Sequence, residues 1–141
     1  MMYNTSTMKE MVYTADRLEK PIILDKGNID GFSYLILNFG THPTAYVSIP
    51  IRHPFYKKDC DDIDIDCHGG LTFSKDCLEI DLNKKVWWIG WDYAHTGDYL
   101  GFLEVMPSAS LIKSVCDKKW ATEEILSEVK NVIEQLKAAN Q

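Results

Sequence analysis

Arginine is scarce in this sequence: only Arg17 and Arg52 occur among 141 residues, and the formal net charge is −6. Non-specific binding to nucleic acid depends on Lys and Arg side chains that neutralise phosphates, so we expect no direct nucleic-acid partner. The chain also lacks any apolar run near the roughly eighteen residues that a membrane-spanning helix needs, so we expect no membrane partner. A chain of this charge is suited to basic partner surfaces or to cations.

Paired cysteine motifs are absent as well. The four cysteines include no C-x-x-C pair, and the N-terminus lacks the basic-then-apolar pattern of a secretory signal. These features predict reduced thiols in a cytoplasmic protein. Hydrophobic residues make up 45% of the chain and charged residues 26%, which is ordinary globular usage. We therefore expect one domain over residues 1–141, with residues 1–9 as a flexible lead-in.

Apolar patterning in the first half of the chain predicts strands. Residues 32–39 are aromatic and aliphatic enough for a buried strand, and residues 45–49 alternate well enough to return as its hairpin partner. A strand should begin at residues 21–24 and turn at residues 25–28. Residues 10–19 could form either a short helix or a turn, because Pro21 disfavours helix in the residue before it.

The second half adds further strands and a helix. Residues 62–66 alternate Asp and Ile, which predicts a strand, and residues 71–73, 78–82 and 86–91 are further candidates. Thr122 is a suitable helix N-cap, and it precedes an apolar stripe at helical spacing. That stripe consists of Ile125, Val129, Val132, Ile133 and Leu136. The fold class is therefore α+β, a mostly antiparallel sheet with the C-terminal amphipathic helix packed on one face.

An acidic cluster spans residues 59–73. It resembles an EF-hand loop at first, but the sixth position is Cys67 instead of Gly and the twelfth is Phe73 instead of Glu. Two interpretations stay open: a solvent-facing row with Lys neighbours, or a surface that binds a cation or a basic partner. The residues concerned are Asp59, Asp61, Asp62, Asp64 and Asp66.

A second polar cluster combines His68, which precedes a Gly pair, with Asp92, His95 and Asp98 at three-residue spacing. We expect residues 59–73, which include His68, and residues 86–98 to form two walls of one site. These side chains could act as general acid and base, and His68, His95 and Asp92 could ligate a metal ion such as zinc. The spacing matches no strong metal signature, so a hydrogen-bonded structural role is the alternative, and no other cofactor is expected.

Three tryptophans lie within residues 87–91. On a strand the first and third share one face with Ile89, while Trp88 and Gly90 share the other, so we expect two indoles in the core. Trp88 is the one we expect to be exposed. With Tyr93 and Tyr99 it could form a stacking wall for a base or a partner's aromatic side chain.

The motifs H-G-G-L-T-F (68–73), W-W-I-G-W-D-Y-A-H-T-G-D (87–98) and H-P-F-Y (53–56) together resemble a group of small proteins from phages, prophages and other mobile elements. Proteins of this kind often antagonise bacterial immunity, and the chain is similar to a type II anti-CRISPR inhibitor. The resemblance implies a host defence protein as partner, in the bacterial cytoplasm, contacted by the acidic row. Residues 99–120 form a longer segment than the shared pattern has.

Two functional hypotheses follow. The first is an inhibitor without enzymatic activity that binds the basic surface of a type II CRISPR nuclease, with a homodimer as one form it could take. The second is a nucleotide-signal binding protein or a metal-dependent hydrolase, with His68, Asp92, His95 and Asp98 around a pocket floored by Trp88. Its phosphate donors would be Arg52, Lys57 and Lys58. The remaining alternative is that both motifs only hold the fold together.

Overall fold

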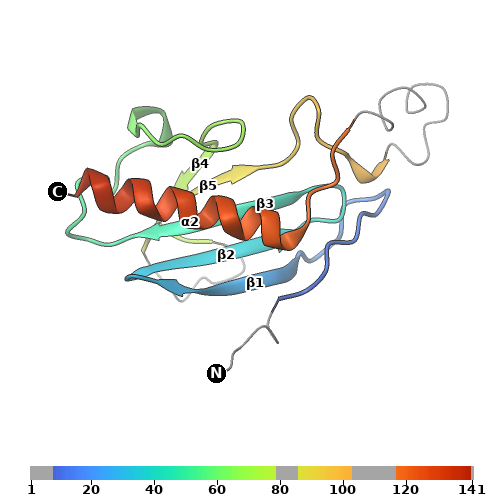
Figure 1. Ribbon diagram of the computed structural model, residues 1–141, viewed down its shortest axis with the longest axis horizontal. Helices are drawn as coiled ribbons and strands as arrows, with labels where there is room; N and C mark the ends of the chain where they lie inside the picture. Colours follow the sequence, from blue (N-terminus) through green and yellow to red (C-terminus); the bar gives the residue numbers. More distant parts are fainter. Residues whose placement is uncertain (1–7, 79–85, 103–116, 141) are drawn as a thin grey trace.

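Five antiparallel strands form one sheet, and a single long helix crosses one of its faces in the computed structural model (Figure 1). The structure describes residues 8–78, 86–102 and 117–140. The strand order across the sheet is β1-β2-β3-β5-β4. The elements are β1 (Ile22–Ile29), β2 (Phe32–Asn38), β3 (Pro43–Ile49), the 3-10 helix η2 (Cys60–Asp62), β4 (Phe73–Lys75), β5 (Trp87–Asp92) and α2 (Thr122–Ala139). The α+β prediction is confirmed.

β1 and β2 are joined by a two-residue turn. Asp30 has φ of 53° and Gly31 has φ of 92°, and a hairpin turn with two positive φ values matches the right-handed twist of the flanking strands. The strand therefore continues through residues 25–28, where we expected a turn, because its backbone pairs with β2 along that stretch. The prediction of a strand over residues 32–39 and a hairpin with residues 45–49 is confirmed.

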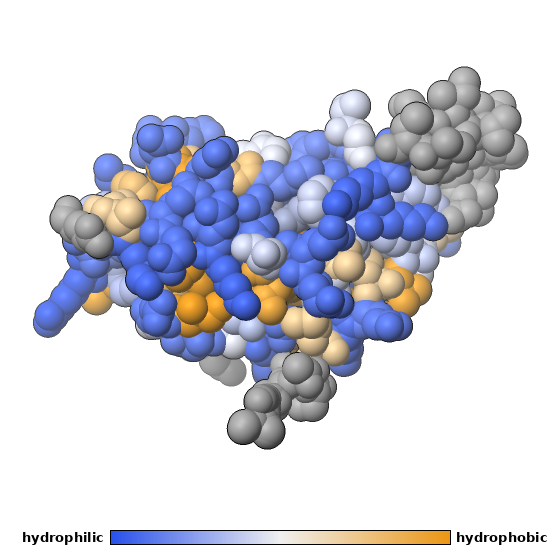
Figure 2. All heavy atoms as spheres, viewed as in Figure 1, coloured by the Kyte–Doolittle hydropathy of each residue, from blue (hydrophilic) through white to orange (hydrophobic). Residues whose placement is uncertain are grey.

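α2 packs against β1, β2 and β3, and its buried apolar side chains are those of the predicted stripe. The outward side of this helix is hydrophilic, and apolar residues show beside it (Figure 2). The prediction that Thr122 is the N-cap is wrong by one residue, because Ala121 holds that position. Thr122 is buried in the first turn instead, where its hydroxyl donates a hydrogen bond to the Lys9 carbonyl at 2.6 Å.

Two apolar clusters lie on opposite faces of the sheet. The cluster under α2 includes Ile36, Val47 and Ile89, all 0% exposed. The cluster on the other face includes Leu37, Tyr46 and Trp88. Side chains of neighbouring strand residues point to opposite faces, so a strand such as β2 supplies both clusters. Both faces of the sheet centre are therefore covered by apolar side chains.

Residues 62–66 do not form the predicted strand: η2 ends at Asp62, and the following residues have no ladder partner. Their backbone bonds to the helix instead. The Asp66 N–H donates to Gln135 Oε1 at 2.8 Å, and Gln135 Nε2 donates to the Asp66 carbonyl at 2.7 Å. This side-chain amide satisfies the polar backbone groups that a neighbouring strand would otherwise satisfy. The predicted alternation survives, because Ile63 and Ile65 are buried.

Other predictions meet mixed outcomes. Residues 10–19 form bends without a helix, and the predicted strand at 71–73 overlaps β4 at Phe73 alone. The predicted strand at 78–82 lies outside the described residues apart from Leu78. β5 matches the predicted strand at 86–91 closely. No helix within the described ranges is both long and apolar enough to cross a membrane.

His53 holds the C-terminal half of α2 against the turn that follows β3. Its Nδ1 accepts a hydrogen bond from the Phe55 N–H at 3.0 Å, so Nε2 carries the proton and donates to the Leu136 carbonyl at 2.7 Å. The side chain is 4% exposed. Proline-flanked His53 thus lies in a turn, as its sequence context indicates, but it also anchors the helix.

Candidate functional site

The acidic residues 59–66 form an exposed ridge beside the C-terminal half of α2. All five carboxylates that the sequence singled out are exposed, and no Lys or Arg within the described parts of the chain forms an ion pair with any of them. Asp59 caps η2 by accepting a hydrogen bond from the Asp61 N–H at 3.1 Å. We call this set, Asp59, Asp61, Asp62, Asp64 and Asp66, the acidic ridge.

The acidic ridge is fixed in place from its inner side. Ile63 and Ile65 alternate with the carboxylates and lie in the core under α2. The Cys60 N–H donates to Ser74 Oγ of β4 at 2.9 Å, and Gln135 holds the backbone of Asp66 at the other end. The interpretation of a row whose carboxylates point outward is therefore supported, although an irregular segment carries the row.

The predicted metal ligands His68, His95 and Asp92 do not form a metal site together among the described residues. Among the described residues, the only three acidic, His or Cys side chains whose ligand atoms all lie within 4.8 Å of one another are Asp59, Cys60 and Asp61. The set His68, His95 and Asp92 does not converge in this way. Exposed acidic groups are common without an ion, so this grouping alone assigns no metal.

His68 and Asp98 form the centre of the second cluster. His68 Nε2 lies 2.7 Å from Asp98 Oδ2, across 30 positions of sequence. The carboxylate can only accept, so Nε2 carries the proton and Nδ1 of the neutral ring keeps a free lone pair. The His68 side chain is 24% exposed while that of Asp98 is 3% exposed. This contact joins residue 68 of the first stretch to residue 98 of the second, and the carboxylates of the acidic ridge take no part in it.

Asp98 accepts hydrogen bonds from three groups. Besides His68, the Trp120 indole N–H donates to Oδ1 at 2.8 Å, and the His95 backbone N–H donates to Oδ2 at 3.0 Å. Buried carboxylates are stable only when their oxygens are paired in this way. Sequence reasoning missed Trp120, whose only signal was being the one tryptophan outside residues 87–91.

His68 is enclosed by aromatic rings and tied to the helix. Its ring stacks on Tyr93 with centroids 4.6 Å apart and planes inclined by 10°, and Trp120 meets it edge-on at 5.0 Å. Its backbone N–H donates to Glu128 Oε1 of α2 at 3.0 Å. Glu128 was also missed, because nothing in the sequence connects a helical glutamate to residue 68. The imidazole orientation is thus fixed from three sides.

The imidazole of His95 lies beside the His68–Asp98 pair but takes no part in the hydrogen bond between them. Its Nε2 is 3.2 Å from Asp92 Oδ1, but the geometry falls outside that of a hydrogen bond, and the atom is buried. Its ring packs over Gly69, whose φ is +70°, and a Cβ at that glycine would overlap the imidazole. Asp92 also accepts a hydrogen bond from the Thr72 hydroxyl at 3.2 Å. The first glycine of H-G-G therefore makes room for His95.

The aromatic stacking wall that we predicted does not exist as an exposed surface. Trp88 is 2% exposed because it packs in the second apolar cluster, and Tyr93 and Tyr99 are 1% and 2% exposed. Tyr93 instead serves as the inner wall for His68, and its hydroxyl accepts a hydrogen bond from Trp91 Nε1 at 3.1 Å. Burial raises the pKa of Tyr93 well above its usual value. Trp88 is therefore a core residue and cannot floor a pocket beside His68.

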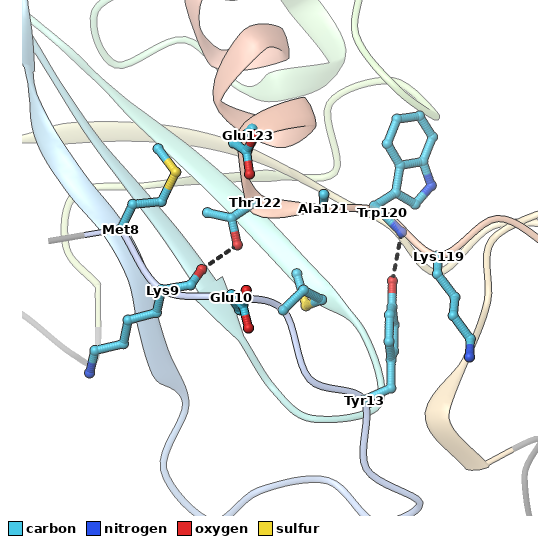
Figure 3. A pocket seen from close by; sticks show the side chains of 10 residues that line it. Met8, Lys9, Glu10, Tyr13, Lys119, Trp120, Ala121, Thr122 and Glu123 are labelled. Carbon is cyan, nitrogen blue, oxygen red and sulfur yellow. Dashed lines mark hydrogen bonds between the residues drawn. The ribbon is translucent and has the colours of Figure 1, made fainter. Parts of the chain in front are cut away.

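A shallow cleft of about 710 Å³ adjoins the cluster on the far side of Trp120, between the N-terminal segment and the start of α2. Figure 3 shows the Trp120 indole pointing away from Tyr13, whose hydroxyl accepts a hydrogen bond from the backbone N–H of Trp120 at 3.0 Å. The same view shows the hydrogen bond from Thr122 to the Lys9 carbonyl. These two bonds place Trp120, and through it Asp98, against the N-terminal segment.

The predicted phosphate donors Arg52, Lys57 and Lys58 are exposed. The ammonium group of Lys58 lies 5.9 Å from the Phe55 ring centroid, and the Lys58 carbonyl accepts a hydrogen bond from Trp87 Nε1. No contact within the described residues joins these three cations to His68. The structure thus brings His68, Asp92, His95 and Asp98 together and leaves out both Trp88 and the phosphate donors.

The fold and these two features define a small α+β protein with an exposed acidic ridge and a separate, hydrogen-bonded His–Asp cluster. Comparison with known proteins gives no family to add to this description. No protein-family model, no curated protein and no solved structure matches the chain.

Proposed function

We propose that the protein binds a basic surface of a host defence protein through the acidic ridge, and so inhibits it. The observation that carries this proposal is the exposure of five carboxylates within eight residues, none of them ion-paired within the described part of the chain. Like charges held this close repel one another, and a partner of opposite charge would relieve that repulsion.

A type II CRISPR nuclease is the partner that fits best. Such a nuclease holds its guide–target duplex in a positively charged channel, which an acidic protein can occupy. The resemblance of its motifs to those of phage and mobile-element proteins agrees with this proposal, in which the encounter would take place in the bacterial cytoplasm. A net charge of −6 would accelerate association with a basic channel and would make that rate sensitive to salt.

The fixed backbone of the acidic ridge supports a binding role. Its hydrogen bonds to Gln135 and Ser74 and the burial of Ile63 and Ile65 hold the carboxylates before any partner arrives. A rigid interface loses less conformational entropy on binding than a flexible one. The same charges would repel the ridge of a second copy, so a homodimer would have to use another surface.

The test replaces Asp62, Asp64 and Asp66 together with Asn and measures binding to a candidate nuclease and inhibition of its DNA cleavage. We expect both to fall by at least about tenfold, with a smaller dependence on salt. The control variant carries Glu10→Gln, Asp16→Asn and Glu123→Gln, which removes the same amount of charge from other exposed positions. If both variants behave alike, net charge is responsible and the acidic ridge is the wrong surface.

A second candidate function rests on the His68–Asp98 pair. A buried carboxylate that fixes an imidazole through Nε2–H leaves Nδ1 as a proton acceptor, which is the arrangement of a general base. The proposed role is proton abstraction or binding of a small ligand beside His68, with His95 and Asp92 as neighbours. His68→Ala and His95→Ala should then abolish an activity that the Asp62, Asp64 and Asp66 variant retains. If both His variants still inhibit the candidate nuclease as fully as the wild-type protein does, this candidate function is removed.

A further inference from the structure

The face of the sheet opposite α2 carries a cleft of about 610 Å³. Its floor is formed by Leu37, Tyr46 and Leu78, which belong to the second apolar cluster. This volume lies within the range of roughly 300–1,000 Å³ that is typical of small-molecule sites. Neither the acidic ridge nor the His68–Asp98 pair contributes to its lining.

The rim of this cleft is basic although the protein is acidic. Arg17, Lys20 and Lys75 line it together with a single carboxylate, that of Glu19. Within the described residues, none of these three cations forms an ion pair. The Arg17 guanidinium, one of only two in the chain, lies 4.3 Å from the centroid of the Phe39 ring. Three cations are thus gathered around a cleft that also has aromatic walls.

The aromatic wall depends on a glycine in the tryptophan-rich strand. Tyr46 and Phe73 pack edge to face with centroids 5.1 Å apart, on either side of Gly90 in the register of the sheet. A Cβ at Gly90 would lie 2.6 Å from Tyr46 Cδ1, too close for the ring to stay where it is. Gly90 therefore gives the Tyr46 ring its place in the cleft.

From this combination we infer that the cleft binds a small anion that carries a flat ring, of the mononucleotide class. The aromatic side chains supply apolar and stacking contacts for the ring, and Arg17, Lys20 and Lys75 supply charge-assisted hydrogen bonds to the phosphate. A polynucleotide is disfavoured, because its many phosphates would meet a protein of net charge −6. The inference is independent of the proposed inhibitory function.

Isothermal titration of the full chain with AMP, adenosine and ribose 5-phosphate tests the site. AMP should bind at least about tenfold more tightly than either fragment, because only AMP has both the ring and the anion. Arg17→Ala and Lys75→Ala should each weaken AMP binding by about five- to tenfold, and Phe73→Leu should weaken it about fivefold while keeping apolar volume. Lys130→Ala, which removes an exposed cation from α2 on the other face, should leave the affinity unchanged.

Three results would each overturn the inference: no AMP binding at millimolar concentration, equal affinity for AMP and adenosine, or an AMP affinity that survives both Arg17→Ala and Lys75→Ala. Amide NMR shifts on AMP addition add an independent check, since they should centre on Tyr46, Phe73 and Lys75. Shifts centred on His68 instead would contradict the location. Replacement of Asp62, Asp64 and Asp66 should not affect AMP binding, so failure here is distinguishable from failure of the proposed function.

Discussion

Replacement of Asp98 by Asn tests whether the hydrogen-bond network around this carboxylate stabilises the fold. Asn has the same shape but only one accepting oxygen, whereas Asp98 accepts through both oxygens. If the amide oxygen faces His68 and the His95 N–H, the amide NH₂ faces the Trp120 indole N–H, and two donors oppose each other. The reverse orientation places the NH₂ against the His95 N–H. At least one of the three hydrogen bonds is therefore lost in either orientation.

The magnitude follows from the burial of Asp98, whose side chain is 3% exposed. Hydrogen bonds to charged groups contribute about 1.5–3 kcal/mol each, so Asp98→Asn should lower the free energy of unfolding by about 2–3 kcal/mol. Asp98→Ala leaves all three donors unpaired and should cost about 4–5 kcal/mol. These losses are a large part of the roughly 5–15 kcal/mol that a domain has in total.

Urea denaturation followed by tryptophan fluorescence measures these differences directly. The matched control is Asp92→Asn, because Asp92 is 27% exposed and accepts hydrogen bonds from the Thr72 hydroxyl and the Ala94 N–H at the longer distance of 3.2 Å. This control should cost less than about 1 kcal/mol. An Asp98→Asn variant as stable as wild type, or as stable as Asp92→Asn, would refute the view that the Asp98 network holds the site together.

Two further predictions concern the glycines of H-G-G and the stability of the fold at alkaline pH. Gly69→Ala should destabilise the fold by at least about 1 kcal/mol more than Gly70→Ala, since both glycines have positive φ but only Gly69 lies under the His95 ring; equal losses in thermal melts would contradict this. Burial raises the pKa of Cys67 from 9.0 to about 12 and that of Tyr34 from 10.0 to about 12, with Glu128 and Asp25 respectively adding to the effect. The unfolded chain therefore releases these protons first, so stability should fall as pH rises from about 9 to 12, and a urea midpoint that stays constant over this range would contradict the assignment.

The sequence predicted the faces of elements better than the partners of those elements. The stripe from Ile125 to Leu136 and the outward Asp of residues 62–66 follow from periodicity alone, because side-chain direction is set by the local backbone. The same alternation did not show that residues 62–66 lack a strand partner. Gln135 meets their backbone across 69 positions, and no local pattern encodes such a contact.

In the His68–Asp98 site, too, the sequence predicted the local features but not the contacts between distant segments. The spacing of Asp92, His95 and Asp98 and the glycines after His68 were sufficient to predict a polar cluster, since these residue types at such spacing cluster on turns. Only the packed chain brings in Trp120 and Glu128, from segments that have no sequence relation to His68. Trp88 was misplaced for a related reason: alternation assigned it to the second face correctly, but could not show that this face is itself covered.

The sequence by itself thus determined an acidic α+β chain, its hairpin, its helix stripe and the residues of both polar clusters. Tertiary structure decided which of those residues meet, because contacts between distant segments depend on how the sheet and helix close over one another. The tertiary structure placed Trp88 in the core and joined His68 to Asp98. It also formed a basic, aromatic cleft on the second face of the sheet, which periodicity showed only to be apolar.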